Sequence, residues 1–427
     1  MGENKTMTYE SEIMDGLNRL YRENRHIRSF KFFLDTSYRW FNREKIRARK
    51  PQVVVLGTGI PEELILAAGI TPYYVLGGSL KSTAWSDDMV PRDTDPVSRS
   101  VLGFLEDPNG PDYSDALFII PATSDSMRKI AYILSDKGYS NHVVDVPPTK
   151  DDLFSRRKWQ KQMMKLTEAV SNHTGSTINS RNINQSLRTV NAAREALKLF
   201  LDLTQGREDI ITGSGRMLVQ SSYYYTENVP RWTEQLMAMN TEIRAHIKTV
   251  RKENAHAMTD SISHRPKVIL MGSPIYFPNY KVPFLVEEIG LSISKNLDVT
   301  TIKNYNKSSM PRRKSNKEYL IRRIADRFLN QDSSSAYSIN EVMFSSVLDS
   351  ISNEKIEGVI YHVLKGQIEY DFELDRIEKL LDNHGIPVFR LETDYQYQDV
   401  EQLRIRMEAF GEMLNQNRYV DQKGRLA

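Results

Sequence analysis

Two apolar stretches near the carboxyl end of the chain, each followed by an amphipathic segment, constrain its fold most. Gly358–Leu364 is a continuous apolar run rich in β-branched residues, which predicts a buried strand. Apolar residues recur at helical spacing over 372–381, and after a Gly-Ile-Pro break residues 388–391 predict a second strand. A final helix is predicted over 400–414. Strand, helix, strand and helix in this order predict a parallel sheet with crossover helices.

Ligands of open parallel sheets bind beyond the carboxyl ends of the strands. The segments 362–367 and 392–394 are therefore the first places to expect chemistry. His362, Glu392 and Asp394 are candidate acid–base residues there, and Asp125, which follows an earlier predicted strand, is a fourth.

The same alternation occurs in the first half of the chain. Strands are predicted at 53–56, 72–76, 116–120 and 139–146, with a helix over 61–68, and further strands begin near 267 and at Ile293. The predicted fold class is α/β, with two Rossmann-like (flavodoxin-like) parallel-sheet domains. We expect an N-terminal helical segment (1–50), a first α/β domain (51–150), a helical insert (151–263) and a second α/β domain (264–427).

The composition excludes several kinds of chemistry. The 427 residues include no cysteine, which rules out disulfides, thiolate catalysis and cysteine-ligated zinc or iron–sulfur centres within this chain. A net charge of +3 and the lack of a nucleic-acid-binding motif argue against a nucleic-acid partner. No apolar run is long enough for a membrane span, and we expect a cytoplasmic protein.

Five motifs together carry a family resemblance: GTGIPEELILAAGITP, PATSD, HVLKGQIEY, GIPVFRLETDY and RIRMEAFGEML. In order and spacing they resemble subunits of 2-hydroxyacyl-CoA dehydratases (lyases) and benzoyl-CoA reductases (oxidoreductases). The resemblance implies two paired subunits, each with a [4Fe-4S] cluster held by cysteines between its α/β domains. It also implies an ATP-dependent activator protein that supplies an electron, and an acyl-CoA thioester as substrate.

This sequence departs from the family at the cluster ligands. Aligned on those motifs, Asp95 (or Ser98 in a shifted register), Ser124 and Gln367 stand where the family has cysteines. A carboxylate, a hydroxyl and an amide cannot replace three thiolates as ligands of an iron–sulfur cluster. We expect no metal in this chain, a [4Fe-4S] cluster in a cysteine-containing paralogous subunit, and these three residues close together across a cleft.

Three functions remain open. The chain is a cluster-free subunit of a heteromeric dehydratase or reductase, a stand-alone acyl-CoA-binding or regulatory protein, or an enzyme that uses the acid–base candidates above. Arg312, Arg313 and Lys314 could bind the phosphates of a CoA thioester or form a solvated loop. The run Tyr223–Tyr225 could line an acyl pocket or a packed helix junction, and the N-terminal aromatic stripe indicates core or a partner-helix interface.

Overall fold

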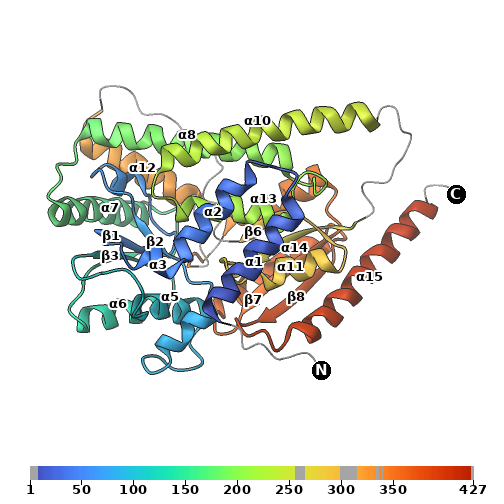
Figure 1. Cartoon of the computed structure of the whole chain (residues 1–427), viewed down its shortest axis with the longest axis horizontal. Helices are drawn as coiled ribbons and strands as arrows, with labels where there is room; N and C mark the ends of the chain where they lie inside the picture. Colours follow the sequence, from blue (N-terminus) through green and yellow to red (C-terminus); the bar gives the residue numbers. More distant parts are fainter. Residues whose placement is uncertain (1–7, 255–264, 299–314, 332–335, 339, 425–427) are drawn as a thin grey trace.

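The computed structural model describes residues 8–254, 265–298, 315–331, 336–338 and 340–424, and within them two four-stranded parallel sheets form the centre of the molecule (Figure 1). The first sheet has the order β2-β1-β3-β4 and the second β6-β5-β7-β8. The strands are β1 (Val53–Leu56), β2 (Tyr73–Val75), β3 (Leu117–Ala122), β4 (Ser140–Asp145), β5 (Lys267–Gly272), β6 (Ser292–Asp298), β7 (Gly358–Leu364) and β8 (Val388–Thr393).

The central strands are apolar throughout because helices cover both of their faces. Every residue of β1, β3 and β7 is buried, which matches the continuous apolar runs in the sequence. In both sheets the second strand in sequence lies on one side of the first, and the third lies on the other side. The strand order therefore reverses beside the first strand, as in flavodoxin-like sheets. The predicted α/β class with two parallel sheets is confirmed.

The helices of the first half connect and flank the first sheet. They are α4 (Glu63–Leu66), the 3₁₀ helix η1 (Lys81–Ser86), α5 (Pro96–Glu106) and α6 (Asp125–Asp136). The helix expected over 61–68 is shorter than predicted. Buried Glu63 pairs there with Arg194, at 2.9 Å, and with Arg327. These ion pairs explain why an acidic residue occurs at the start of this helix. Burial alone would raise the pKa of Glu63, but the two guanidinium groups outweigh burial and lower this pKa.

Long helices form a layer along one side of both sheets (Figure 1). They are α7 (Leu153–Thr174), α8 (Ser180–Thr204), α10 (Val229–Asn254) and α12 (Lys317–Gln331). The shorter α9 (Gly213–Ser221) and the 3₁₀ helix η2 (Ser222–Tyr225) lie between α8 and α10 in the sequence. Buried Trp159 on α7 donates to the carbonyl of Ala325 on α12 at 3.0 Å. A helix from the second half is thereby packed onto the helices that precede it. None of the helices within the described residues is both long and apolar enough to cross a membrane.

The N-terminal helices α1 (Tyr9–Asn24), α2 (Phe30–Phe41) and α3 (Arg43–Ile46) cross in front of both sheets (Figure 1). Phe30, Phe33 and Phe41 of the aromatic stripe are buried in the main core. Buried Glu12 accepts from the hydroxyl of Ser79, at 2.6 Å, and from the backbone N–H of Leu80, the residue before η1, at 2.8 Å. This segment is therefore part of the packed molecule.

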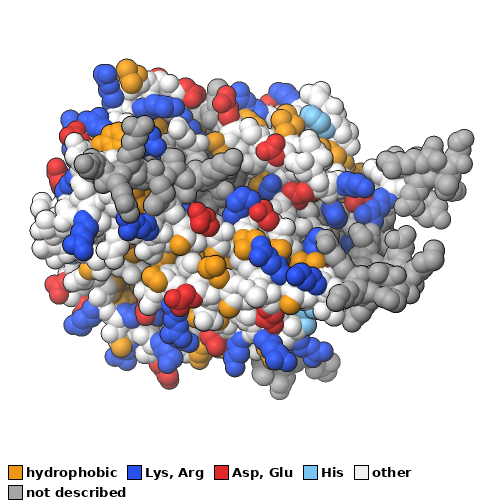
Figure 2. All heavy atoms as spheres, turned by 90° about the horizontal axis from the view of Figure 1, so that it is seen from above, with side chains coloured by type: hydrophobic (Ala, Val, Ile, Leu, Met, Phe, Trp, Pro, Cys, Tyr) orange, Lys and Arg blue, Asp and Glu red, His pale blue; other side chains and the backbone are white. Residues whose placement is uncertain are grey.

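The second half contains α11 (Lys281–Glu288), α13 (Glu341–Glu354), α14 (Glu369–Asp382) and α15 (Val400–Gly424). Helices α14 and α15 follow β7 and β8, as the sequence predicts. Figure 2, which views the molecule from the side of the long helix layer, shows Lys and Arg side chains interspersed with Asp and Glu across that face.

Candidate functional site

A polar pocket of about 80 Å³ lies where the carboxyl ends of β1, β3 and β7 meet. Both α/β halves contribute to its wall. Its polar lining consists of Thr58, Asp95, Ser98, Thr123, Ser124, Tyr276, Gln367, Glu369 and Tyr370. The structure therefore brings together the three residues predicted from the sequence to stand at the family's cysteine positions, and Ser98 of the shifted register lies with them.

Asp95 reaches the pocket because it caps the first turn of α5. Its side chain accepts a hydrogen bond from the backbone N–H of Ser98 at 2.9 Å, and Pro96 occupies the first helical position. Both features are typical of a helix N-terminus. The same oxygen accepts from Nε2 of Gln367 at 3.3 Å. This bond joins the first α/β half directly to the second.

Gln367 lies in the turn that follows β7. Gly366 precedes it with a φ of +84°, and a Cβ there would lie 3.1 Å from the carbonyl oxygen of Asp93. Glycine is therefore suited to this close approach of the two halves. Gln367 is only 8% exposed, and its Oε1 has no hydrogen-bond partner within the described part of the chain. The amide of Gln367 therefore forms one wall of the pocket, and its carbonyl oxygen is an unsatisfied acceptor.

Ser124 caps α6 in the same way as Asp95 caps α5, accepting from the backbone N–H of Met127 at 3.3 Å. Asp125, one residue later, is exposed and is not part of the pocket lining. With α14, which begins at Glu369, three helix N-termini converge on the pocket. Their positive ends favour negative groups. Asp95, Asp125 and Glu369 supply those groups.

Glu369, Thr58 and Tyr276 are lining residues that sequence reasoning missed. Burial, with a contribution from the carboxylates of Asp95 and Asp125, raises the pKa of Glu369. Tyr276 is hydrogen-bonded to Thr58, and burial raises the pKa of its hydroxyl. Glu369 is the first residue of α14, and nothing in the local sequence indicates a functional role for it. Its proximity to Asp95 arises only when the two α/β halves pack together.

The other acid–base candidates lie outside this pocket. His362 is buried within β7, where its Nε2 is 2.7 Å from Oγ1 of Thr393 and burial lowers its pKa to about 4. Glu392 is exposed and pairs with Arg390 at 3.0 Å. Asp394 pairs with Lys365 at 3.2 Å. The four candidates are therefore not assembled into one site, and their catalytic roles remain predictions.

The cationic segment Arg312, Arg313 and Lys314 lies outside the described residues. Its predicted contact with CoA phosphates therefore has no structural description.

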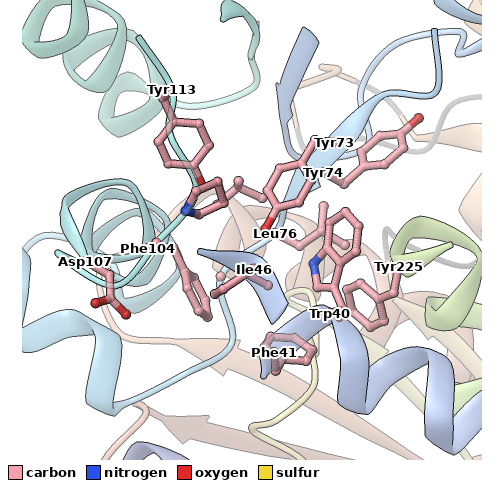
Figure 3. A pocket seen from close by; sticks show the side chains of 14 residues that line it. Trp40, Phe41, Ile46, Tyr73, Tyr74, Leu76, Phe104, Asp107, Tyr113 and Tyr225 are labelled. Atoms are coloured by element: carbon pink, nitrogen blue, oxygen red, sulfur yellow. The ribbon is translucent and has the colours of Figure 1, made fainter. Parts of the chain in front are cut away.

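A second, aromatic cavity lies between α2, β2 and η2, and Figure 3 shows its lining. Trp40 stacks on Tyr73 with ring centroids 4.3 Å apart, and Tyr225 packs edge-on against Phe41. The remaining space is about 20 Å³, enough for about one water molecule. Tyr223 and Tyr224 are also buried among aromatic rings. The tyrosine run therefore fills a packed junction.

The donor set of the polar pocket does not fit an iron–sulfur cluster. Asp95 already accepts two hydrogen bonds, Gln367 presents a neutral amide, and Ser124 accepts from the backbone. Iron–sulfur clusters are held by soft thiolates, and hard oxygen and amide groups are poor substitutes.

The comparisons with known proteins agree with the motifs. The family model described as 2-hydroxyglutaryl-CoA dehydratase, D-component, matches residues 58–414. The chain is 24% identical to the candidate dehydratase subunit YjiM of Escherichia coli (strain K12) over 365 residues, which cover 85% of this chain and 91% of that protein. It is 22% identical to the (R)-phenyllactyl-CoA dehydratase beta subunit of Clostridium sporogenes over 358 residues, which cover 83% of this chain and 89% of that protein. The chain belongs to the 2-hydroxyglutaryl-CoA dehydratase D-component family.

Proposed function

We propose that this chain is a cluster-free subunit of a 2-hydroxyacyl-CoA dehydratase or benzoyl-CoA reductase-type complex. A cysteine-bearing paralogous subunit carries the [4Fe-4S] cluster and receives an electron from an ATP-dependent activator protein. The partner then reduces or dehydrates the acyl-CoA thioester, and this chain shapes or supports the shared cavity.

The observation that carries the proposal is the pocket formed by Asp95, Ser124 and Gln367. These three residues, distant in sequence, keep the geometry of a common site but offer no thiolate. The direct bond between Asp95 and Gln367 holds the two halves together without a metal. The hydrogen bond between Asp95 and Gln367 supports the view that this cleft still has a function.

A surface beside the pocket supports the partner. Ile368 and Phe372 are 66% and 75% exposed, and they lie one turn apart at the start of α14. Adjacent Gln367 and Glu369 line the pocket. Large apolar side chains at such spacing are typical of a helix face that another protein covers. A related subunit that contacts this face would lie directly over the pocket.

The test is co-expression of the tagged chain with a cysteine-bearing paralogue from the same source. We expect the chain alone to be colourless and iron-free, and the pair to co-purify with iron and to turn over acyl-CoA once the activator and ATP are added. Phe372→Glu should abolish co-purification. Met237→Glu, at an exposed apolar residue on α10, is the matched control.

Two outcomes would contradict the proposal. Stoichiometric iron in the isolated chain would refute the cluster-free assignment. Tight acyl-CoA binding by a chain that never pairs with the paralogue would favour a stand-alone binding protein instead.

A further inference from the structure

A separate cavity of about 250 Å³ opens along the edge strand β6 of the second sheet. Its walls come from α8, α9, β6 and α13, and none of its lining residues belongs to the polar pocket between the two halves. At about 30 Å³ for each water molecule, the cavity has room for about eight waters, or for a ligand with a similar number of non-hydrogen atoms.

The glycine-rich start of α9 explains how this wall is built. Thr212 caps the helix by accepting from the N–H of Gly215 at 3.0 Å, and Ser214 donates twice to Glu287. A Cβ on Gly213 would lie 2.6 Å from the Cβ of Ile293, so only glycine lets α9 approach β6 this closely. Arg216 and Gln220, one turn apart, then line the cavity together.

Arg216 places a buried positive charge in this wall. It is 4% exposed and donates to the backbone carbonyls of Thr204, Ile211, Ile293 and Ser294. All of these acceptors are neutral. The carboxyl groups of Glu208, Glu287 and Glu354 all act on this guanidinium. Burial raises the pKa of Glu208 and raises that of Glu287 to about 7, so these two carboxyls compensate the charge of Arg216 only in part.

Gln220 offers an unused acceptor. It is 7% exposed, and among the described residues its Oε1 has no hydrogen-bond partner. An unsatisfied buried acceptor carries a desolvation penalty that a bound donor would relieve. This unsatisfied acceptor is an observation, independent of the cavity's volume, that points to a ligand with a hydrogen-bond donor.

The remaining lining groups define the chemistry of that occupant. Lys198 and Lys295 add two cations, of which Lys295 also pairs with Glu354 at 3.7 Å, and Asp202 and Asp349 add two carboxylates. The Lys198–Asp202 pair is 54% and 57% exposed, so it contributes little and can be exchanged for ligand contacts. Leu201, Met217 and Leu297 supply an apolar wall. A cavity with both charge signs and an apolar wall suits a zwitterion with an aliphatic side chain.

We propose that this cavity binds a small aliphatic α-amino acid. Its carboxylate would lie toward the cations, its ammonium group toward Gln220 Oε1 and the carboxylates, and its side chain against the apolar wall. This site shares no lining residue with the polar pocket, and the proposal does not depend on the proposed partner.

The test is calorimetric titration of the full-length chain with L-leucine. Two analogues of matched shape separate the contacts: 4-methylpentanoate lacks the amino group, and 3-methylbutylamine lacks the carboxylate. We expect leucine to bind and each analogue to bind at least about tenfold more weakly, because each loses a charge-assisted contact.

Variants then locate the site. Gln220→Met removes the free acceptor at nearly constant volume and should weaken leucine binding about tenfold without lowering thermal stability. Asp349→Asn tests the contact with the ligand's ammonium group, and because Asp349 is exposed this substitution should not impair folding. Gln398→Met, in an exposed turn, is the matched control and should leave the affinity unchanged. The proposal is overturned if leucine gives no heat at millimolar concentration, or if neither cavity variant changes its affinity.

Discussion

At the scale of single residues, burial decides the ionisation of the groups that the sequence offered as catalysts. His362 lies near the carboxyl end of a strand-like run, and a histidine there suggests acid–base chemistry. In the structure it is 3% exposed and hydrogen-bonded to Thr393. Its surroundings therefore favour a neutral imidazole.

This has a consequence for stability at acid pH. The pKa of His362 is lowered by burial to about 4, against about 6.5 in an unfolded chain. The unfolded state therefore binds the proton first, and stability that is present above pH ~6.5 is lost as the pH falls toward ~4. Between pH 7 and pH 5 this loss amounts to about 2 kcal/mol.

We predict that His362→Gln reduces the difference in unfolding free energy between pH 7 and pH 5 by about 2 kcal/mol, whatever its effect at pH 7. Urea denaturation at the two pH values measures this. His384→Gln, at an exposed histidine, serves as the control. An unchanged pH dependence in the His362 variant would show that the imidazole is already solvated or charged.

At the scale of elements, close contacts between helices depend on a few glycines. Gly103 lies in α5, where an added Cβ would lie 1.9 Å from the carbonyl oxygen of Ser82 in η1. Gly411 lies in α15, where the nearest atom would be 3.6 Å away. The two residues are both within helices, but only the first is held against another backbone.

Alanine substitutions should therefore have opposite effects. We predict that Gly103→Ala destabilises the protein by about 1–3 kcal/mol or more, since α5 must move away from η1. Gly411→Ala should stabilise it by up to about 1 kcal/mol through helix propensity alone. Chemical denaturation measures both changes. Because Asp95 caps α5, the first variant should also disturb the polar pocket; equal effects of the two substitutions would contradict this packing.

At the scale of the whole molecule, two α/β halves place Asp95, Ser124 and Gln367 in one pocket. If this pocket occupies the position of the family's cluster, restoring the thiolates should restore metal binding. We predict that Asp95→Cys, Ser124→Cys and Gln367→Cys together let the chain bind about four iron ions after anaerobic reconstitution with iron and sulfide. Iron and sulfide analysis and visible absorption measure the gain.

The matched control places three cysteines at neighbouring exposed positions: Asp93→Cys, Asp125→Cys and Ile368→Cys. These side chains do not line the pocket and should give no stoichiometric cluster. Equal iron content in both triple variants would mean that the pocket has no special geometry for a cluster.

The sequence by itself determined the secondary structure and the family of this protein. Apolar runs marked the central strands β1, β3, β5 and β7, because central strands of a parallel sheet have no solvent-facing side and need nearly continuous apolar residues. Its lack of cysteine determined that any cluster ligand would have to be something other than a thiolate. Alignment on the motifs was enough to predict that Asp95, Ser124 and Gln367 lie close together, as they do in the polar pocket.

Only the tertiary structure decided what surrounds these residues. The Asp95–Gln367 bond, the raised pKa of Glu369 and the buried charge of Arg216 all arise between segments that are far apart in the chain. Hydrophobic periodicity predicts which side chains become buried, but it does not predict which buried side chains contact one another. Hydrogen bonds need partners about 3 Å apart, and electrostatic interactions weaken with distance, so both depend on which side chains lie close together.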